Sequence, residues 1–293
     1  MNSGTAGVIK RHPAWIRVKL PVGDEAGKTA EIIGRHGLRT VCRDARCPNA
    51  GECWTLATAT FLVLGGICTG ACRFCSVAKG TPVKPDPSEP ERVARGIAEL
   101  GLRHAVITSV TRSDLPDGGA GHFAETVRAI RAQCPGVTIE VLVPDFAGSR
   151  KAVDTVLDSG VEVFGHNIET VPRLYSSLRP RASYPRSLAV LGQAAASGRT
   201  LAKTAILLGM GEEPEEVLDV MRDIRSAGVT ALALGQYLKP GEDSTPVARY
   251  LPPEEFDLLR DKALGLGFVQ VMSGPFVRSS YRAGEYLGRT VPA

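Results

Sequence analysis

Two groups of three cysteines are the residues of this sequence best suited to chemistry. Six of the seven cysteines lie between Val41 and Val77, with the spacings C-x4-C-x5-C and C-x3-C-x2-C. Thiolates are soft ligands for zinc and iron–sulfur clusters, and a structural zinc site takes four protein ligands. Three cysteines on a cubane cluster would instead leave one iron open to another ligand. The first group is Cys42, Cys47 and Cys53, and the second is Cys68, Cys72 and Cys75.

Disulfides and zinc are the alternatives for these cysteines. Short-loop cysteines in a large chain without a secretory signal are not typical of a disulfide framework. A zinc ion in either group would need a fourth ligand, and the nearest histidines are His36 and His104. Cys134 lies far from both groups, and we expect it to be a half-buried apolar residue. We therefore favour iron–sulfur clusters in both groups.

Length and composition limit the class of protein. A chain of 293 residues that is 43% hydrophobic can form one barrel-sized domain or two smaller ones. A net charge of +4 and an aromatic content of 5% do not favour a nucleic-acid partner. No run of about 18 apolar residues predicts a membrane-spanning helix. Because thiolate–metal chemistry needs a reducing compartment, we expect a cytoplasmic protein that acts without a membrane.

Short apolar runs alternate with helical patterns along most of the chain, which predicts parallel β/α units. We expect an α/β fold, a partial (β/α)6 TIM-type barrel with N- and C-terminal extensions. The active sites of such barrels lie at the C-terminal ends of the strands, where the second cysteine group follows the first strand. The predicted strands are 60–64, 104–109, 137–143, 161–166, 200–207 and 230–235, with a last short strand at 268–272. The predicted helices are 26–36, 91–101, 121–133, 150–159, 183–197, 213–227 and 253–266, and 14–21 is expected to be extended.

The second cysteine group resembles the radical S-adenosylmethionine (SAM) superfamily. Residues 67–77 read ICTGACRFCSV, with an aromatic residue directly before the third cysteine. The resemblance implies that these three cysteines hold a [4Fe–4S] cluster whose fourth iron is chelated by SAM. One electron from that cluster cleaves SAM to a 5′-deoxyadenosyl radical, and the protein supplies orientation and excludes side reactions.

The first group and the end of the chain together resemble lipoyl synthases. Residues 40–54 read TVCRDARCPNAGECW, and residues 278–281 read RSSY. The resemblance implies an auxiliary [4Fe–4S] cluster on Cys42, Cys47, Cys53 and a serine oxygen. We assign that oxygen to Ser280, with Ser279 as the alternative, and expect this ligand to tie the chain ends over the barrel mouth. Alone, RSSY would be an ordinary polar turn.

The same resemblance implies the contacts to SAM. Residues 108–120 (TSVTRSDLPDGGA) and 166–171 (HNIETV) match segments of the family at strand ends. An amide and a carboxylate two residues apart on an extended strand point the same way; the alternative is a capping asparagine followed by a solvated glutamate. The residues implied to bind SAM are Thr111, Asn167, Glu169, Arg179 and Lys203. The chain departs from the family pattern at Gly66, Gly70, Ser113 and Ala205.

The implied activity is the insertion of two sulfur atoms at C6 and C8 of an octanoyl chain held on a lysine of a carrier protein. The implied partners are an octanoylated carrier domain (H protein or E2 subunit), a one-electron reductant of ferredoxin or flavodoxin type, and cluster-assembly proteins. The expected domains are an N-terminal extension (1–57), the barrel (58–252) and a C-terminal extension (253–293). The alternatives are a biotin-synthase-like enzyme, a methylthiotransferase, or a non-catalytic iron–sulfur or zinc protein.

Overall fold

Seven parallel strands form one open sheet in this computed structural model, which describes residues 12–18, 24–56 and 58–289. The strands follow one another in chain order, and the described residues of β1 and β7 do not pair. The predicted partial barrel is therefore confirmed. The strands are β1 (Thr60–Val63), β2 (His104–Ser109), β3 (Thr138–Leu142), β4 (Val163–Gly165), β5 (Leu201–Leu208), β6 (Ala231–Gln236) and β7 (Gln270–Gly274).

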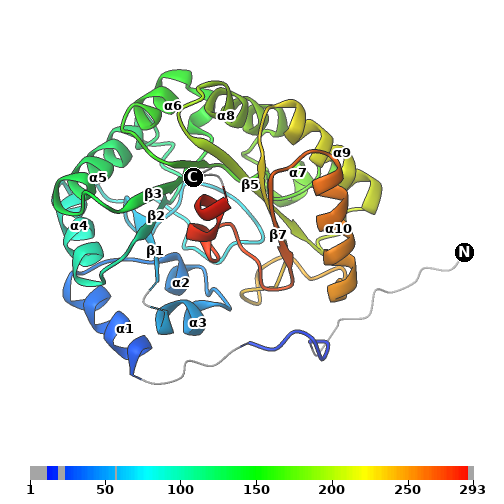
Figure 1. Ribbon diagram of the computed structural model, residues 1–293, viewed down its shortest axis with the longest axis horizontal. Helices are drawn as coiled ribbons and strands as arrows, with labels where there is room; N and C mark the ends of the chain where they lie inside the picture. Colours follow the sequence, from blue (N-terminus) through cyan, green and yellow to red (C-terminus); the bar gives the residue numbers. More distant parts are fainter. Residues whose placement is uncertain (1–11, 19–23, 57, 290–293) are drawn as a thin grey trace, which may run out of the picture.

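Helices between successive strands cover the outside of the sheet (Figure 1). Their bounds and those of the strands lie within two residues of the prediction, because long elements carry a clear hydrophobic period. The N-terminal helix α1 (Glu25–Arg35) packs beside this ring. The other predicted helices are α4 (Glu89–Glu99), α5 (Ala120–Gln133), α6 (Arg150–Leu157), α8 (Tyr184–Ala196), α9 (Pro214–Ser226) and α10 (Pro253–Gly265).

The prediction missed the shortest helices. Thr40 caps α2 (Val41–Asp44) by accepting a hydrogen bond from the Arg43 N–H, and a proline opens α7 (Pro172–Leu178). Neither helix is long enough to show a period of 3.6 residues. The remaining short elements are α3 (Ala50–Thr55) and the 3-10 turns η1 (Phe146–Gly148) and η2 (Ala283–Arg289).

The C-terminal segment, residues 275–289, fills the middle of the barrel (Figure 1). Small residues make room for it: a Cβ at Gly235 would lie 1.9 Å from the carbonyl oxygen of Val277. Ala205 and Ala233 pack against the same valine. In contrast, the leucines that alternate with Ala233 on β6 belong to the main core beneath the helices.

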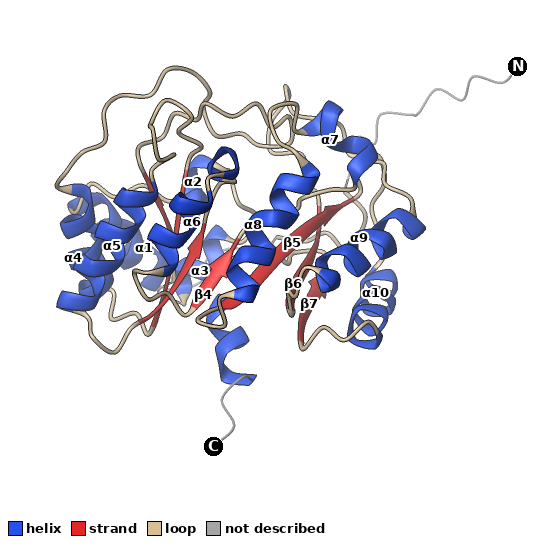
Figure 2. Cartoon of the chain, turned by 90° about the horizontal axis from the view of Figure 1, so that it is seen from above, coloured by secondary structure: helices blue, strands red, loops and turns tan. Residues whose placement is uncertain are grey.

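This segment ends at the opposite side of the barrel from the expected one. The Tyr286 hydroxyl donates to the carbonyl oxygen of Leu232 at 3.3 Å, near the start of β6. Gly284 lies against His104, the first residue of β2. Figure 2 shows η2 (Ala283–Arg289) below the sheet and α7 above it. The segment therefore does not cross the barrel mouth, because the small strand residues let it descend inside.

The start of the described chain packs on the barrel, and Ala14 and Trp15 form a turn where an extended segment was predicted. The Trp15 indole donates to the carbonyl oxygen of Leu251 at 3.1 Å. Residues 19–21 of the predicted extended segment lie outside the described residues. No helix in the described ranges has both the length and the apolar character needed to span a membrane.

Candidate functional site

The second cysteine group lies on the long loop after β1, at the C-terminal end of the strand. The loop closes on itself, because the Cys68 N–H donates to the Ala78 carbonyl oxygen at 2.8 Å and the Gly80 N–H donates to that of Cys68. All three thiols are partly buried. Burial, together with the neighbouring Cys72 and Cys68 thiols, raises the pKa of Cys75 to about 11. The three sulfurs thus share one electrostatic environment.

Backbone N–H groups surround the Cys68 sulfur. Gly70 and Thr111 approach it with their N–H groups at 3.2 and 3.3 Å. Both donors belong to backbone beside the cysteine loop, so they hold the sulfur in place. A Cβ at Gly70 would lie 3.1 Å from this sulfur and 3.4 Å from the Thr111 hydroxyl. Gly70 is therefore in close contact with the sulfur, and Thr111 lies beside the group as predicted.

Three of the other residues predicted to bind SAM lie together near Cys72. Asn167 follows β4, and its amide donates to a carboxylate oxygen of Glu169 at 3.1 Å. The Arg179 guanidinium donates to the carbonyl oxygens of Asn167 and Ile168. Burial raises the pKa of Cys72, while Arg179 lowers it and Glu169 raises it. The predicted pairing of amide and carboxylate is present, although Glu169 has a φ of 69° rather than an extended backbone.

This site keeps unused polar atoms, which is what a polar ligand requires. Asn167 Oδ1 and Arg179 Nε are buried without a hydrogen-bond partner among the described residues, a situation that proteins normally avoid. Burial raises the pKa of Glu169 even though Arg179 and Asn167 lower it. An amide oxygen, a carboxylate and a guanidinium beside three thiols match the amino, carboxylate and ribose groups of SAM.

Lys203 lies elsewhere. It is the third residue of β5 and is fully buried, with its ammonium 2.9 Å from both carboxylate oxygens of Glu140 on β3. The same ammonium lies 4.0 Å from the centre of the Tyr286 ring. Because Lys203 points into the barrel towards the C-terminal segment, it does not join the residues around the second cysteine group. We therefore leave it out of the SAM site proposed below.

The first cysteine group lies on α2, α3 and the turn between them. The Cys47 N–H donates to the Cys42 carbonyl oxygen at 3.1 Å, and the Cys53 N–H donates to that of Asn49 at 2.9 Å. Burial, together with the neighbouring Cys42 and Cys47 thiols, raises the pKa of Cys53 to about 12. The Cys42 and Cys47 thiols are therefore close enough to Cys53 to influence its ionisation.

The C-terminal segment is bonded to this group. The Asn49 amide donates to the Phe276 carbonyl oxygen at 2.7 Å, and the Tyr281 hydroxyl donates to a Glu52 carboxylate oxygen at 3.1 Å. A cavity of about 830 Å³ opens here, and its lining includes Ser280 and all three cysteines. Ser279 is buried and does not line that cavity. Of the two serines, Ser280 is therefore the one that shares this cavity with the three cysteines.

Neither cysteine group forms a site for a single metal ion in the described part of the chain. Among the described residues no three side chains of His, Cys, Asp or Glu lie close enough to hold a single metal ion. A cubane cluster takes one thiolate on each of three irons, so its ligands need not converge in this way. The lack of a single-ion site among the described residues is therefore no argument against a cluster.

The sequence analysis missed two residues near the cysteines. Arg278 lies between the two groups: burial lowers its pKa, and the Cys47 thiol and the Glu169 carboxyl raise it. Tyr237 follows β6 and lies near Cys75. Burial raises the pKa of the Tyr237 hydroxyl, and the Cys75 thiol raises it as well. Arg278 lies within the RSSY motif, but a motif does not reveal which cysteine a side chain will meet.

Comparison with known proteins decides the family. The model of the radical SAM superfamily matches residues 62–224. The lipoyl synthase of Chlorobaculum parvum is 50% identical over 98% of this chain and 97% of its own length. The chain belongs to the lipoyl synthase family. The lipoyl synthase of Thermus thermophilus is 51% identical over 94% of this chain and 86% of its own length, and that of Geobacter metallireducens is 50% identical over 96% and 99%.

Solved structures agree at the level of the fold. Streptococcus suis SuiB has a TM-score of 0.56 at 11% identity, covering 84% of this chain and 52% of its own. Methylornithine synthase has a TM-score of 0.53 at 15% identity, covering 75% of both chains. As a lipoyl synthase with a radical SAM domain, the chain is a sulfur-inserting enzyme whose superfamily implies a [4Fe–4S] cluster and SAM.

Proposed function

We propose that this lipoyl synthase inserts sulfur at C6 and C8 of an octanoyl chain held in amide linkage on a lysine of a carrier protein, using two [4Fe–4S] clusters. The observation that carries the proposal is the pair of cysteine groups. One lies at the C-terminal ends of the strands, and the other lies against the C-terminal segment inside the same barrel. A chain with one group could make a radical or supply sulfur, but not both.

The proposed radical site consists of Cys68, Cys72 and Cys75, with Thr111, Asn167, Glu169 and Arg179 around them. When bound, the clusters and SAM supply a 5′-deoxyadenosyl radical at one site and sulfur atoms at the other. The residues around the radical site supply orientation. Asn167 and Glu169 offer an amide oxygen and a carboxylate to the SAM amino group and ribose, while the Arg179 guanidinium suits a carboxylate.

The proposed sulfur-donor site consists of Cys42, Cys47, Cys53 and Ser280. A serine oxygen is a harder ligand than a thiolate and holds iron less firmly. Such a ligand suits a cluster that must release iron as its sulfur is used. Replacing Ser280→Cys is therefore expected to slow at least one of the two insertions, and full-rate insertion by that variant contradicts this role.

The proposed partners follow from the same chemistry. The substrate is an octanoylated carrier domain of the H-protein or E2 type. Because SAM cleavage consumes electrons, a one-electron donor of ferredoxin or flavodoxin type is required. Because the sulfur donor is consumed, cluster-assembly proteins must rebuild it. A reducing compartment, the cytoplasm, is the proposed setting.

Three variants and the wild-type protein test the two-cluster proposal. Replacing either cysteine group by alanine is expected to remove about half of the iron and sulfide, since each cubane holds its own four irons. Without the first group, the protein still cleaves SAM but sulfurates nothing; without the second, it does neither. The matched control is Cys134→Ala, outside both groups, which keeps all the iron. Tightly bound zinc without sulfide in the wild-type protein would contradict the proposal.

A further inference from the structure

The backbone turns sharply where β1 ends. Leu64, the residue after the strand, has a φ of 66° and is only 1% exposed. Left-handed backbone is uncommon for residues other than glycine and persists when surrounding contacts enforce it. Leu64 lies four residues before Cys68, so its conformation sets the direction in which the cysteine loop leaves the sheet.

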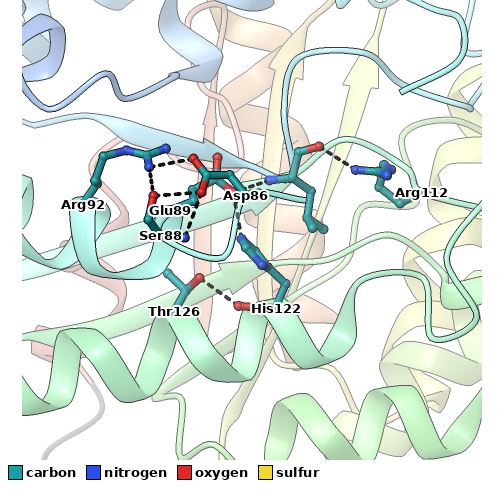
Figure 3. A network of polar contacts seen from close by, with 8 residues as sticks. Asp86, Ser88, Glu89, Arg92, Arg112, His122 and Thr126 are labelled. Carbon is teal, nitrogen blue, oxygen red and sulfur yellow. Dashed lines mark hydrogen bonds and ion pairs between the residues drawn. The ribbon is translucent and has the colours of Figure 1, made fainter. Parts of the chain in front are cut away.

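A buried carboxylate holds the N–H of Leu64. Glu89, the first residue of α4, accepts this hydrogen bond at 2.8 Å through Oε2. The same oxygen lies 2.7 Å from Nε2 of His122 on α5. Glu89 and His122 are 8% and 9% exposed. Figure 3 shows their side chains meeting between the two helices. The N–H of Leu64 is thereby fixed to two helices at once.

A buried guanidinium holds the carbonyl oxygen of the same residue. Arg112, 2% exposed, donates from Nη1 to Leu64 O at 3.0 Å and from Nη2 to Val83 O at 2.9 Å. Leu64 and Val83 flank residues 65–82, the loop that carries all three cysteines. One side chain therefore joins the two ends of that loop. Asp114 keeps the fork in place, with its carboxylate 2.7 Å from Nη2.

The neighbours of Arg112 bind the same loop from within. The Thr111 N–H approaches the Cys68 sulfur, and the Thr111 carbonyl oxygen accepts from the Thr69 N–H at 3.0 Å and from its hydroxyl at 2.9 Å. The Ser113 N–H donates to that hydroxyl at 2.9 Å. The backbone on either side of Arg112 is thus hydrogen-bonded to Thr69, the neighbour of Cys68. The Arg112 side chain meanwhile joins the two ends of the loop.

We propose that Glu89, Arg112 and His122, here called the Leu64 clamp, are positioning residues that hold the loop of residues 65–82 in the geometry that lets its three cysteines share one cluster with SAM. This role rests on the proposed function of those cysteines. None of the three residues is a predicted ligand; they act through the backbone of the loop. Groups that orient metal ligands typically affect metal affinity or activity about 10- to 100-fold.

The substitution Arg112→Lys tests the clamp most directly. A lysine keeps the positive charge, but its single ammonium lacks the planar fork that reaches two carbonyl oxygens and Asp114 together. The matched control is Arg92→Lys, in the same region. Arg92 bonds Asp86 and Ser88 at the start of α4 and does not touch the cysteine loop (Figure 3). A second, milder pair is Glu89→Gln, which keeps an acceptor for the Leu64 N–H, and Glu89→Ala, which does not.

The first readout is hydrogen exchange of residues 65–82, which requires no cluster. Arg112→Lys is expected to speed exchange in this loop at least about tenfold relative to Arg92→Lys, with the rest of the barrel unchanged. The second readout is the change that SAM causes in the electron paramagnetic resonance spectrum of the reduced second-group cluster, in protein whose first group is replaced by alanine. That change is expected to require about 10- to 100-fold more SAM in Arg112→Lys and Glu89→Ala, and to recover in Glu89→Gln.

Loop exchange in Arg112→Lys equal to that in Arg92→Lys would overturn the clamp. Faster exchange with an unaltered SAM response would overturn its positioning role and leave only a structural one. If wild-type protein shows no SAM response at all, the proposed function fails, and the exchange comparison still decides whether Arg112 fixes the loop.

Discussion

Removing the ammonium of Lys203 is the sharpest test of how the inside of the barrel is held together. Lys203 and Glu140 are both 0% exposed and lie on β5 and β3. The His104 Nε2 atom lies 3.6 Å from Oε2 of Glu140. Burial raises the pKa of Glu140, but Lys203 and His104 outweigh it and the net pKa is lowered. In Lys203→Met the Glu140 carboxylate therefore stays buried but loses the ammonium group that is its main ion-pair partner.

The expected cost is large because the remaining charge cannot reach water. Breaking a buried ion pair by removing one partner costs about 3–5 kcal/mol. The lost contact with the Tyr286 ring adds to this figure, since a desolvated cation–π contact is worth about 2 kcal/mol. The double change Lys203→Met with Glu140→Leu is expected to recover most of the loss, because an apolar pair of similar volume carries no desolvation cost. Urea unfolding followed by circular dichroism measures these differences.

Arg249→Met is the matched control. Its guanidinium bonds Glu255 at 2.7 and 2.8 Å, but both side chains are exposed, so the loss is expected to be about 0–1 kcal/mol. SAM affinity is expected to stay at the wild-type value in Lys203→Met, since the side chain does not reach the cysteines. A wild-type unfolding curve together with a raised KM for SAM would refute the reasoning and return Lys203 to the SAM site.

Three further outcomes are expected. Burial, together with the Arg179 charge, lowers the pKa of His166 to about 4. The unfolded state then binds more protons between about pH 6.5 and 4, so stability falls by on the order of 3 kcal/mol as pH drops through that window. Calorimetry should show a flatter pH profile for His166→Gln. Gly235→Ala is expected to displace the Val277 carbonyl and the segment bearing Ser280. Iron analysis should then show about half of the bound iron, while SAM cleavage continues. Glu169→Gln is expected to raise the KM for SAM about tenfold with both clusters in place, since one charge-assisted hydrogen bond is lost, and an unchanged KM would remove Glu169 from the site.

The barrel could be predicted from the sequence because its elements are long enough to carry a period. The apolar runs of the strands and the stripes of the helices are local signals, and their bounds followed within two residues. The second cysteine group could be placed for the same reason, since it directly follows the first predicted strand. These inferences needed no knowledge of how distant segments meet.

Contacts between distant segments could not be predicted. The family resemblance implied that Lys203 binds SAM. Its actual partner is Glu140, which is 63 residues away in the sequence and could not be paired with it from the sequence alone. The neighbour of Gly119 is equally hidden in the sequence: a Cβ at this position would lie 2.3 Å from Leu64 Cδ1, so the glycine makes room for a core side chain. A Cβ at Gly66 would likewise meet the Arg39 guanidinium at 2.2 Å. A glycine in a sequence indicates that there is little room for a side chain, but it does not show which atoms fill that room.

The most direct test of the central claim is mass spectrometry of an octanoyl-lysine peptide after anaerobic incubation with the reconstituted protein, SAM and a strong reductant. The account predicts a peptide that has gained two sulfur atoms, with 5′-deoxyadenosine formed alongside it. It also predicts that protein lacking Cys42, Cys47 and Cys53 forms 5′-deoxyadenosine and leaves the peptide without sulfur. A sulfurated peptide from that variant, or an unchanged peptide from wild-type protein carrying both clusters, would contradict it.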